Sequence, residues 1–427
     1  MDISDKDIIT ILREEASPAL GCTEPVACAL ACARCREELG EMPDKIEVAV
    51  SGNIFKNGMG VGIPGTGMTG LPIAAALGAV CGKTAYGLEV LKDVSVGDNL
   101  AKAKDLMERG AVKISIAADA SDKLYADAVV YKGKDKVRTL IVHSHTNITL
   151  VEKNGETIFS NPYGAEGDGG KQRPELSMQR IWRFIREVDV EDIAFLMEGV
   201  EMNKAISDEG LKHSYGLQIG KTIKKNIEKG FLKDDFINQA LLRATSASDA
   251  RMDGCEKPVM TNSGSGNQGI TVYMPVIVLA EHLDAPREKL LKALALSNLV
   301  AAHIHYYTGH LSALCGILMA ASGSSAAMTY LLGGEYEQVV AAVKIMASNL
   351  TGMMCDGAKQ GCALKVYSGV SAAVSSALMA MEWTVARNDG IVDGDIEKTI
   401  KNIGLIAKEG MEKTDASILD IMCRKQI

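Results

Sequence analysis

The spacing of apolar positions changes along the chain and divides it into regions. Residues 5–16 and the stretch from Thr23 to about Glu38 repeat their apolar positions with helical spacing. Thr23 is placed to cap the second helix, and Pro25 suits its first turn. The pattern therefore predicts a helical N-terminal segment, residues 1–40.

Alternation of apolar and polar residues, which is typical of strands, dominates the next region, residues 41–165. Runs rich in Val, Ile and Thr cover residues 45–51, 112–118, 125–131 and 138–151. Helical spacing at 68–82 and 97–109 separates the first two runs. We expect a small α/β domain here, and the turn-forming segment 161–171 predicts its connection to the rest of the chain.

Helical periodicity returns at Ser177 and continues to the end, which predicts an all-α domain over residues 166–427. The predicted fold class is α+β: a large all-α C-terminal domain, with a smaller inserted α/β domain after N-terminal helices that pack on the all-α domain. Residues 293–334 contain no Asp, Glu, Lys or Arg and are long enough to span a membrane. Polar residues such as Asn298 and His303 interrupt them and basic flanks are missing, which favours a buried helical pair lining a site.

Composition and charge narrow the function. Hydrophobic residues make up 47% of the 427 residues but aromatic ones only 4%, which favours close helix packing over a β-sandwich. A net charge of −8 without an extended basic run argues against nucleic acid as a partner. The N-terminus is polar and acidic, unlike a secretory signal, so we expect a cytoplasmic protein without a membrane partner. In that reducing compartment the ten cysteines are ligands, catalytic groups or core residues, not disulfides.

Three cysteines near the C-terminal end are the strongest chemical feature. Cys315, Cys355 and Cys362 are each set among glycines and other small residues. Three thiolates leave one iron of a cubane cluster open to act as a Lewis acid. The spacing is not that of ferredoxins or paired zinc knuckles, and buried core cysteines explain it equally well. The neighbouring glycines, which admit a bulky cluster, favour ligands.

Cys22 directly precedes a predicted helix N-terminus, where amide donors and the helix dipole lower a thiol pKa and attract a carboxylate. It is a candidate reactive thiol, and a buried cysteine in a turn is the alternative. Cys28, Cys32 and Cys35 follow on one face of that helix, which indicates core packing.

Two glycine-rich loops are candidate binding segments. The loop 261–269, with Ser263, Ser265 and Asn267, places amides and hydroxyls ahead of an apolar helix, as a cradle for a small zwitterion does, although a plain loop has the same composition. The loop 60–65 matches the dinucleotide fingerprint only formally, because Pro64 stands where the helix should open. A structural or substrate-facing loop is the better interpretation there.

The histidines and one lysine are weaker candidates for a catalytic role. His303, His305 and His310 are possible acids or bases, but buried helical histidines are more often only hydrogen-bonded. Lys359 is the one lysine in a loop suited to a pyridoxal Schiff base, and no partner motif accompanies it.

Taken together, these segments resemble the iron-sulfur L-serine dehydratase alpha-chain family, and most closely its L-cysteine desulfidase branch with uncharacterised bacterial members. The resemblance covers nearly the whole chain. It rests on residues 21–25, 51–53 with the glycine loop to 70, 263–267, 314–316 and 355–365.

The resemblance implies a 4Fe-4S cluster held by Cys315, Cys355 and Cys362, with Cys22 removing the substrate's α-proton. The expected substrate-binding residues are Thr23, Glu24, Asn53, Ser263, Ser265 and Asn267. In the dehydratases a C-terminal cysteine also caps the free iron, but the residues around Cys423 do not match that pattern.

The expected activity is a pyridoxal-independent lyase reaction that converts L-cysteine to pyruvate, ammonia and sulfide. Serine dehydratases carry Ser-Ser-x-His-Thr where this chain has Gly-Cys-Thr-Glu-Pro, and this departure favours cysteine as the substrate. The alternatives are an L-serine dehydratase and a non-catalytic protein that binds or senses an amino acid. A small amino acid is the expected partner, and a homodimer is the candidate oligomer.

Overall fold

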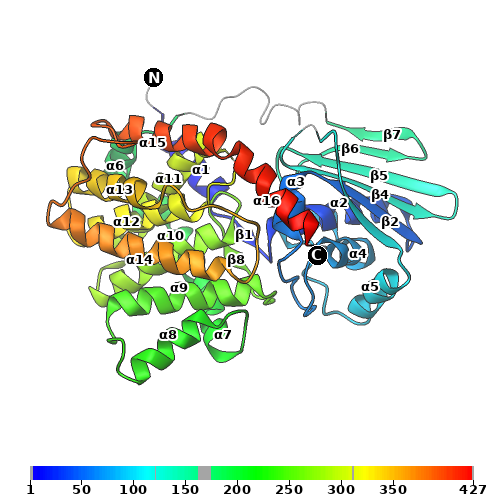
Figure 1. Ribbon diagram of the computed structural model, residues 1–427, viewed down its shortest axis with the longest axis horizontal. Helices are drawn as coiled ribbons and strands as arrows, with labels where there is room; N and C mark the ends of the chain where they lie inside the picture. The colour runs from blue at the N-terminus through cyan, green and yellow to red at the C-terminus, as the bar shows by residue number, and fades with distance from the viewer. Residues whose placement is uncertain (1–2, 121, 162–174, 310–311, 426–427) are drawn as a thin grey trace.

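The protein has two parts that lie side by side, one built on a β-sheet and one built of helices alone (Figure 1). The structure, a computed structural model, describes residues 3–120, 122–161, 175–309 and 312–425. The arrangement confirms the predicted α+β class. The segment predicted to connect the two parts lies, beyond Asn161, outside the described residues.

The sheet has six strands in the order β3-β2-β4-β5-β6-β7. Only the β2 and β3 pair is parallel, and all other neighbours are antiparallel. The strands are β2 (Lys45–Val50), β3 (Val112–Ile116), β4 (Tyr125–Lys132), β5 (Asp135–Val142), β6 (Ile148–Lys153) and β7 (Glu156–Ser160). The run predicted at 138–151 is therefore two strands joined by a turn. The sequence did not indicate β7, because every one of its residues is exposed and no alternation marks it.

Two helices, α2 (Thr23–Leu39) and α4 (Leu71–Cys81), share a hydrophobic core with the sheet. The helices approach closely at Gly78, where a Cβ atom would come within 2.1 Å of the Ala29 carbonyl oxygen. The shorter α3 (Gly52–Gly58) and α5 (Asn99–Glu108) complete this part.

The placement of α2 on the sheet corrects the expectation that both N-terminal helices pack on the all-α domain. Only α1 (Asp5–Glu15) contributes to the helical core, through residues such as Ile8 and Leu12. The small residues of α2 are buried almost all round, so its sequence shows no distinct apolar face that would identify its neighbour.

The helical part surrounds α12, which contacts α10, α11, α13 and α14. Its helices are α6 (Met178–Glu187), α7 (Leu196–Lys212), α8 (Ile219–Glu228), α9 (Phe236–Met252), α10 (Gly266–His282), α11 (Arg287–Thr308), α12 (Ile317–Leu331), α13 (Tyr336–Leu350), α14 (Cys362–Met381) and α15 (Ile396–Leu405). The charge-free stretch 293–334 contains most of α11 and all of α12, which are buried and pack against each other, as predicted.

By length and composition, one helix of the described chain, α14, is apolar enough to cross a membrane. Half of its apolar window is buried inside the protein. Core helices of soluble proteins meet the same criteria, so this is weak evidence for a span.

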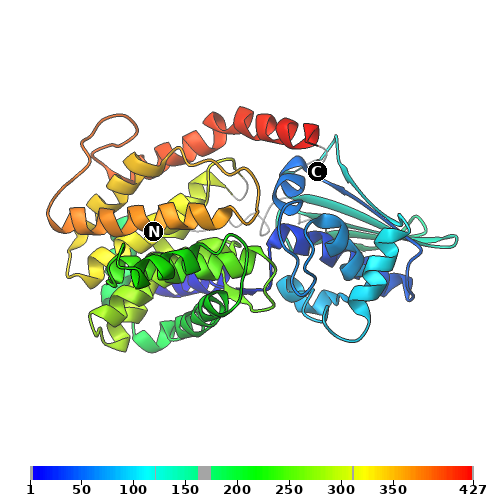
Figure 2. The same cartoon turned by 60° about the horizontal axis from the view of Figure 1, so that its bottom comes forward.

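Two contacts join the parts near the site. The two-residue strand β1 (Pro18–Ala19) pairs with β8 (Val259–Met260), which fastens the chain just before Cys22 to the chain just before the 261–269 loop. The C-terminal helix α16 (Glu412–Arg424) reaches from the helical part to the sheet part (Figure 2). There the Asp415 carboxylate lies 2.5 Å from the Nζ atom of Lys56, whose side chain is only 2% exposed.

We predict that Asp415→Ala loosens α16. The substitution leaves the buried Lys56 ammonium without its carboxylate, which costs about 3 kcal/mol for a buried pair. Amide hydrogen exchange in α16 should accelerate by about a hundredfold, as measured by mass spectrometry.

Asp420→Ala is the matched control, because Asp420 pairs with Arg424 on the exposed side of the same helix. We expect this pair to contribute less than about 0.5 kcal/mol. Equal exchange rates in the two variants would show that the Lys56 pair does not hold α16.

Candidate functional site

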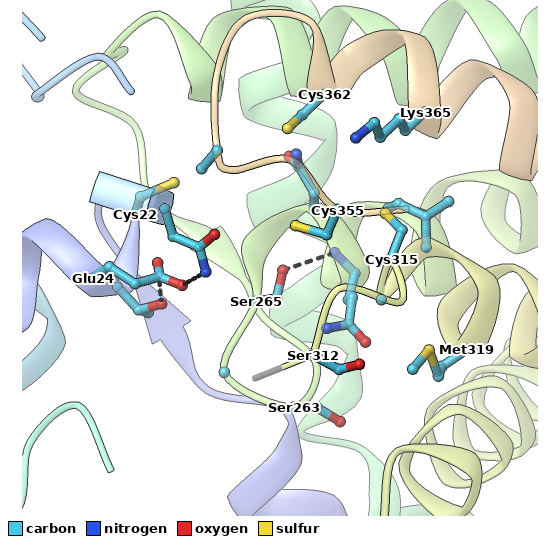
Figure 3. A pocket seen from close by; sticks show the side chains of 18 of the residues that line it. Cys22, Glu24, Ser263, Ser265, Ser312, Cys315, Met319, Cys355, Cys362 and Lys365 are labelled. Carbon is cyan, nitrogen blue, oxygen red and sulfur yellow. Dashed lines mark hydrogen bonds between the residues drawn. The ribbon is translucent and has the colours of Figure 1, made fainter. Parts of the chain in front are cut away.

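A pocket with an empty volume of about 930 Å³, including its open mouth, lies where the two parts meet. The start of α2, α3 and the β5–β6 turn contribute Cys22, Thr23, Glu24, Asn57 and His145. The helical part contributes the loop after β8, the end of α9 and the three predicted cluster cysteines. Figure 3 shows Cys22 and Glu24 on one side of the pocket and Cys315, Cys355 and Cys362 on the other.

The segments that carry Cys315 and Cys355 are held together by backbone hydrogen bonds. Cys315 N donates to Met353 O at 2.8 Å, and Cys355 N donates to Ala313 O at 2.6 Å. Leu314 and Met354 form an antiparallel bridge between these bonds. Two cysteines that are distant in sequence are thus neighbours for a reason independent of their side chains.

Helix N-termini position three of the four pocket cysteines. Cys22 is the N-cap residue of α2, Cys362 is the first residue of α14, and Cys315 lies just before α12. Exposed amide groups and the helix dipole favour negative charge at such positions. The helix ends therefore oppose the cost of holding buried thiolates. The structure also shows that Cys22, and not the predicted Thr23, is the N-cap of α2.

Burial has the opposite effect on these thiols. Burial and, to a smaller extent, the nearby Cys355 raise the pKa of Cys315 to about 12, although the Lys365 ammonium acts to lower it. Burial also raises the pKa of Cys362. Without a cation these groups stay protonated at neutral pH, whereas metal ligation would deprotonate them.

A cluster of three charged side chains lies beside the candidate cysteine ligands. Asp356 lies between two lysines: Lys359 Nζ approaches its Oδ2 atom to 2.5 Å, and Lys365 bonds its Oδ1 atom. Partial burial raises the pKa of Asp356, but hydrogen bonds from the two lysines outweigh it and lower the pKa to about 2. Lys365 also donates to Met354 O at 2.8 Å, which ties the first turn of α14 to the Cys355 segment.

The donor set fits a cluster better than a single ion. Within the described residues, no three His, Cys, Asp or Glu side chains are placed to hold one metal ion together. The ligands of a cubane cluster bind separate irons, so their sulfurs need not converge on one point. Cys315, Cys355 and Cys362 are free of disulfides and line one pocket, as the ligands of such a cluster must.

Cys22 is buried on the other side of the pocket, and Cys362 packs against the small apolar cluster to which Cys22 belongs. Burial raises the pKa of its thiol to about 11, and the charge of the Arg251 guanidinium opposes this rise. Arg251 Nη2 donates to Gly21 O at 3.1 Å, so the same arginine holds the turn that carries Cys22.

The glycine loop 60–65 supports this turn and is structural. Gly62 N donates to Met252 O at 3.0 Å, and Gly65 N donates to Gly254 O at 3.1 Å, so the loop packs on the end of α9. Gly21 has a φ of +79° and lies against Pro64, where a Cβ atom would come within 2.9 Å of the proline ring. These contacts agree with the structural interpretation of the loop and not with a dinucleotide site.

Of the three predicted substrate-binding residues in the first 60 positions, two line the pocket and one does not. Thr23 and Glu24 line the pocket, but Asn53 is not among the lining residues. Asn57, one helical turn further along α3, lines it instead and donates from Nδ2 to Glu24 Oε1 at 2.9 Å. Because no helix was predicted at 52–58, no pattern favoured Asn57 over Asn53.

Ser263, Ser265 and Asn267, the predicted binding residues of the loop after β8, all line the pocket. Ser263 has a positive φ of 50° and donates to Glu15 Oε2 at 2.6 Å. Ser265 caps α10, and Asn267 accepts a hydrogen bond from Ser248 at 3.2 Å. The loop is therefore held in shape by its own polar side chains.

The remaining candidate residues differ in whether they line the pocket. His305 lines the pocket, whereas His303 is buried against Glu397 at 2.7 Å and does not; His310 lies outside the described residues. Lys359 is outside the pocket and pairs with Asp356. Cys423 is exposed near the end of α16, also outside the pocket. Cys28, Cys32 and Cys35 are core residues, as predicted.

Sequence reasoning missed several polar residues of the pocket wall: Asn57, His145, Arg251, Gln268, Ser312 and Lys365. An arginine among the small residues at the end of α9 was the available indication for Arg251, and a lysine one turn after Cys362 was the indication for Lys365.

Comparison with known proteins places the chain in a family. Residues 85–420 match the family described as serine dehydratase alpha chain. A UPF0597 protein of Parabacteroides distasonis is 46% identical over 423 residues, and one of Oleidesulfovibrio alaskensis is 46% identical over 420 residues, with 98% of both chains covered in each case. A UPF0597 protein of Actinobacillus pleuropneumoniae serotype 3 is 44% identical over 423 residues, which cover 99% of this chain and 98% of the relative. The chain thus belongs to the serine dehydratase alpha chain family.

Proposed function

We propose that the protein is an iron-sulfur-dependent lyase that catalyses pyridoxal-independent β-elimination from a small L-amino acid. L-cysteine is the proposed substrate, with pyruvate, ammonia and sulfide as products. Cys315, Cys355 and Cys362 are the proposed ligands of a 4Fe-4S cluster. The observation that carries the proposal is that these three thiols line one pocket and that Cys22 lies across it.

When bound, the cluster would supply a Lewis-acidic iron for the departing group. Cys22 as thiolate takes the proton from the substrate's α-carbon. The electrons of that C–H bond form the Cα–Cβ double bond, and the Cβ–S bond breaks with its electron pair on sulfur. Aminoacrylate leaves and hydrolyses to pyruvate and ammonia, so no net oxidation or reduction occurs.

The other pocket residues support this reaction. The N-terminus of α2 and the Arg251 guanidinium favour the thiolate form of Cys22. Amide and hydroxyl groups of the loop after β8 are available to the substrate's polar groups. Burial of Cys22 excludes water that would compete for the proton.

L-serine is the second candidate substrate, and the family description favours it. A serine substrate would release water in place of sulfide by the same bond changes. The thiol at position 22, where serine dehydratases have a different motif, favours L-cysteine. Pyruvate release from each amino acid by the anaerobically reconstituted protein decides between them, and release from neither would contradict the proposed function.

We predict that cluster binding and proton removal can be separated by mutation. Cys355→Ala should lose both iron and turnover, because it removes a ligand. Cys22→Ala should keep its iron and lose turnover by at least about a hundredfold, the usual contribution of a general base. Iron content and pyruvate formation measure the two properties independently.

Cys423→Ala is the control for both variants, since this cysteine is exposed and lies outside the pocket. It should retain iron and activity. Full activity in Cys22→Ala would remove Cys22 from the mechanism, and full iron content in Cys355→Ala would remove that residue from the ligand set.

The raised pKa of Cys22 gives a separate prediction for the iron-free protein. Because the thiolate is the reactive form, alkylation of Cys22 by iodoacetamide should accelerate about tenfold per pH unit from pH 7 to pH 10, below the pKa of about 11. Peptide mass spectrometry measures the rate at this site. A rate that levels off below pH 9 would show that the thiol titrates lower.

A further inference from the structure

Three polar atoms in the pocket wall are buried and find no hydrogen-bond partner among the described residues. They are Arg251 Nε, a donor, and Asn57 Oδ1 and Gln268 Oε1, both acceptors. Their side chains belong to residues that are 5%, 8% and 7% exposed. Buried polar atoms are almost always hydrogen-bonded, so three unsatisfied ones around a single pocket indicate places for the polar atoms of a ligand.

Arg251 has the properties of an anion-binding residue. Arg251 donates from Nη2 to Gly21 O at 3.1 Å and from Nη1 to the weakly accepting Met252 Sδ at 3.3 Å, and it also hydrogen-bonds the Cys22 side chain. Across the part of the chain that the structure describes, no carboxylate pairs with it. Gly266 leaves space for the guanidinium, since a Cβ atom there would come within 2.2 Å of Nε.

The other long cation in the wall is already engaged. Lys365 bonds the Asp356 carboxylate and Met354 O. Of the arginine and lysine side chains that line the pocket in the described residues, Arg251 is therefore the one whose charge is not balanced by a carboxylate. A buried unbalanced guanidinium is costly, and an incoming carboxylate would offset that cost.

Glu24 and Asn57 offer hydrogen-bond acceptors, whereas Arg251 offers a cationic donor. Asn57 Nδ2 donates to Glu24 Oε1 at 2.9 Å, which orients the amide so that Oδ1 remains an acceptor. Thr23 donates to Glu24 Oε2 at 3.3 Å. A carboxylate and an amide oxygen side by side accept hydrogen bonds from an ammonium group.

We infer that Arg251 binds the α-carboxylate of a free amino acid and that Glu24 and Asn57 bind its ammonium group, so that the pocket selects a zwitterion. This inference rests on the proposed function and assigns the orientation of its substrate. Arg251 bonds the carbonyl of Gly21, and Glu24 follows Cys22 by two positions, so Cys22 lies between the two binding groups along the chain. A substrate held by both groups would have its α-carbon, which carries the carboxylate and the ammonium, on the side of the pocket that Cys22 lines.

Calorimetric titration of the anaerobically reconstituted protein tests the inference with ligands that carry no leaving group. The probes are L-alanine, L-alaninamide, which has no carboxylate, and propionate, which has no ammonium group. Arg251→Gln should weaken L-alanine binding by about ten- to a hundredfold and leave L-alaninamide unchanged. Asn57→Leu should weaken L-alanine binding and leave propionate unchanged.

Arg243→Gln is the matched control, because Arg243 lies on the same helix and pairs with Asp208 at the surface. It should bind all three probes as the unmodified protein does. Arg251→Lys, which keeps the charge, should recover part of the lost affinity for L-alanine.

Two results would overturn the inference: equal weakening of L-alanine and L-alaninamide by Arg251→Gln, which indicates a structural role, or no binding of L-alanine by the unmodified protein. The proposed function fails separately. Arg251-dependent binding of L-alanine without pyruvate formation from L-cysteine or L-serine would support the zwitterion site and reject the lyase. Pyruvate formation by Arg251→Gln with an unchanged KM would support the lyase and reject the zwitterion site.

Discussion

The site depends on the short antiparallel backbone contact between the Cys315 and Cys355 segments. This contact brings two thiols together before any metal is present, and the first turn of α14 adds Cys362. Burial alone would keep these thiols neutral and inert, since it raises the pKa values of Cys315 and Cys362. Helix N-termini and Lys365 supply the opposing positive potential, so the same arrangement is ready for a ligand that requires thiolates.

The sheet part of the molecule places the proposed base and polar binding groups across the pocket from the proposed cluster ligands. The sheet part brings Cys22 and Glu24 at the start of α2 and Asn57 on α3. The β1–β8 pair and the α16 contact through Lys56 and Asp415 fix the sheet part against the helical part. Lys56 Nζ also lies 3.4 Å from Cys355 O, so the contact that holds α16 reaches the loop of a proposed ligand. The position of Cys22 relative to the cysteine cluster is therefore a property of how the parts pack and not of either part alone.

The sequence predicted the fold class and the chemistry-bearing loops, because both leave local patterns. Cysteines flanked by glycine and the serine-rich loop at 263–267 stand out from their surroundings and all line the pocket. Arg251 and Asn57 left weaker traces, since a polar residue in a helix becomes notable only when tertiary packing buries it. The choice of Asn53 over Asn57 failed for the same reason: α3 is a short helix whose phase decides which side chain faces the site. The location of α2 on the sheet was also a matter of packing, because its small residues are compatible with either neighbour.

The proposed function requires that three cysteines of this pocket hold a cluster with one open iron that meets the substrate. Mössbauer spectroscopy of the protein reconstituted with ⁵⁷Fe, before and after addition of L-cysteine or L-serine, tests it most directly. One iron of the four in the cluster should change its signal on substrate addition, while the other three stay as they were. A protein that binds no cluster, or a cluster whose four irons are equivalent and unaffected by either amino acid, would contradict it.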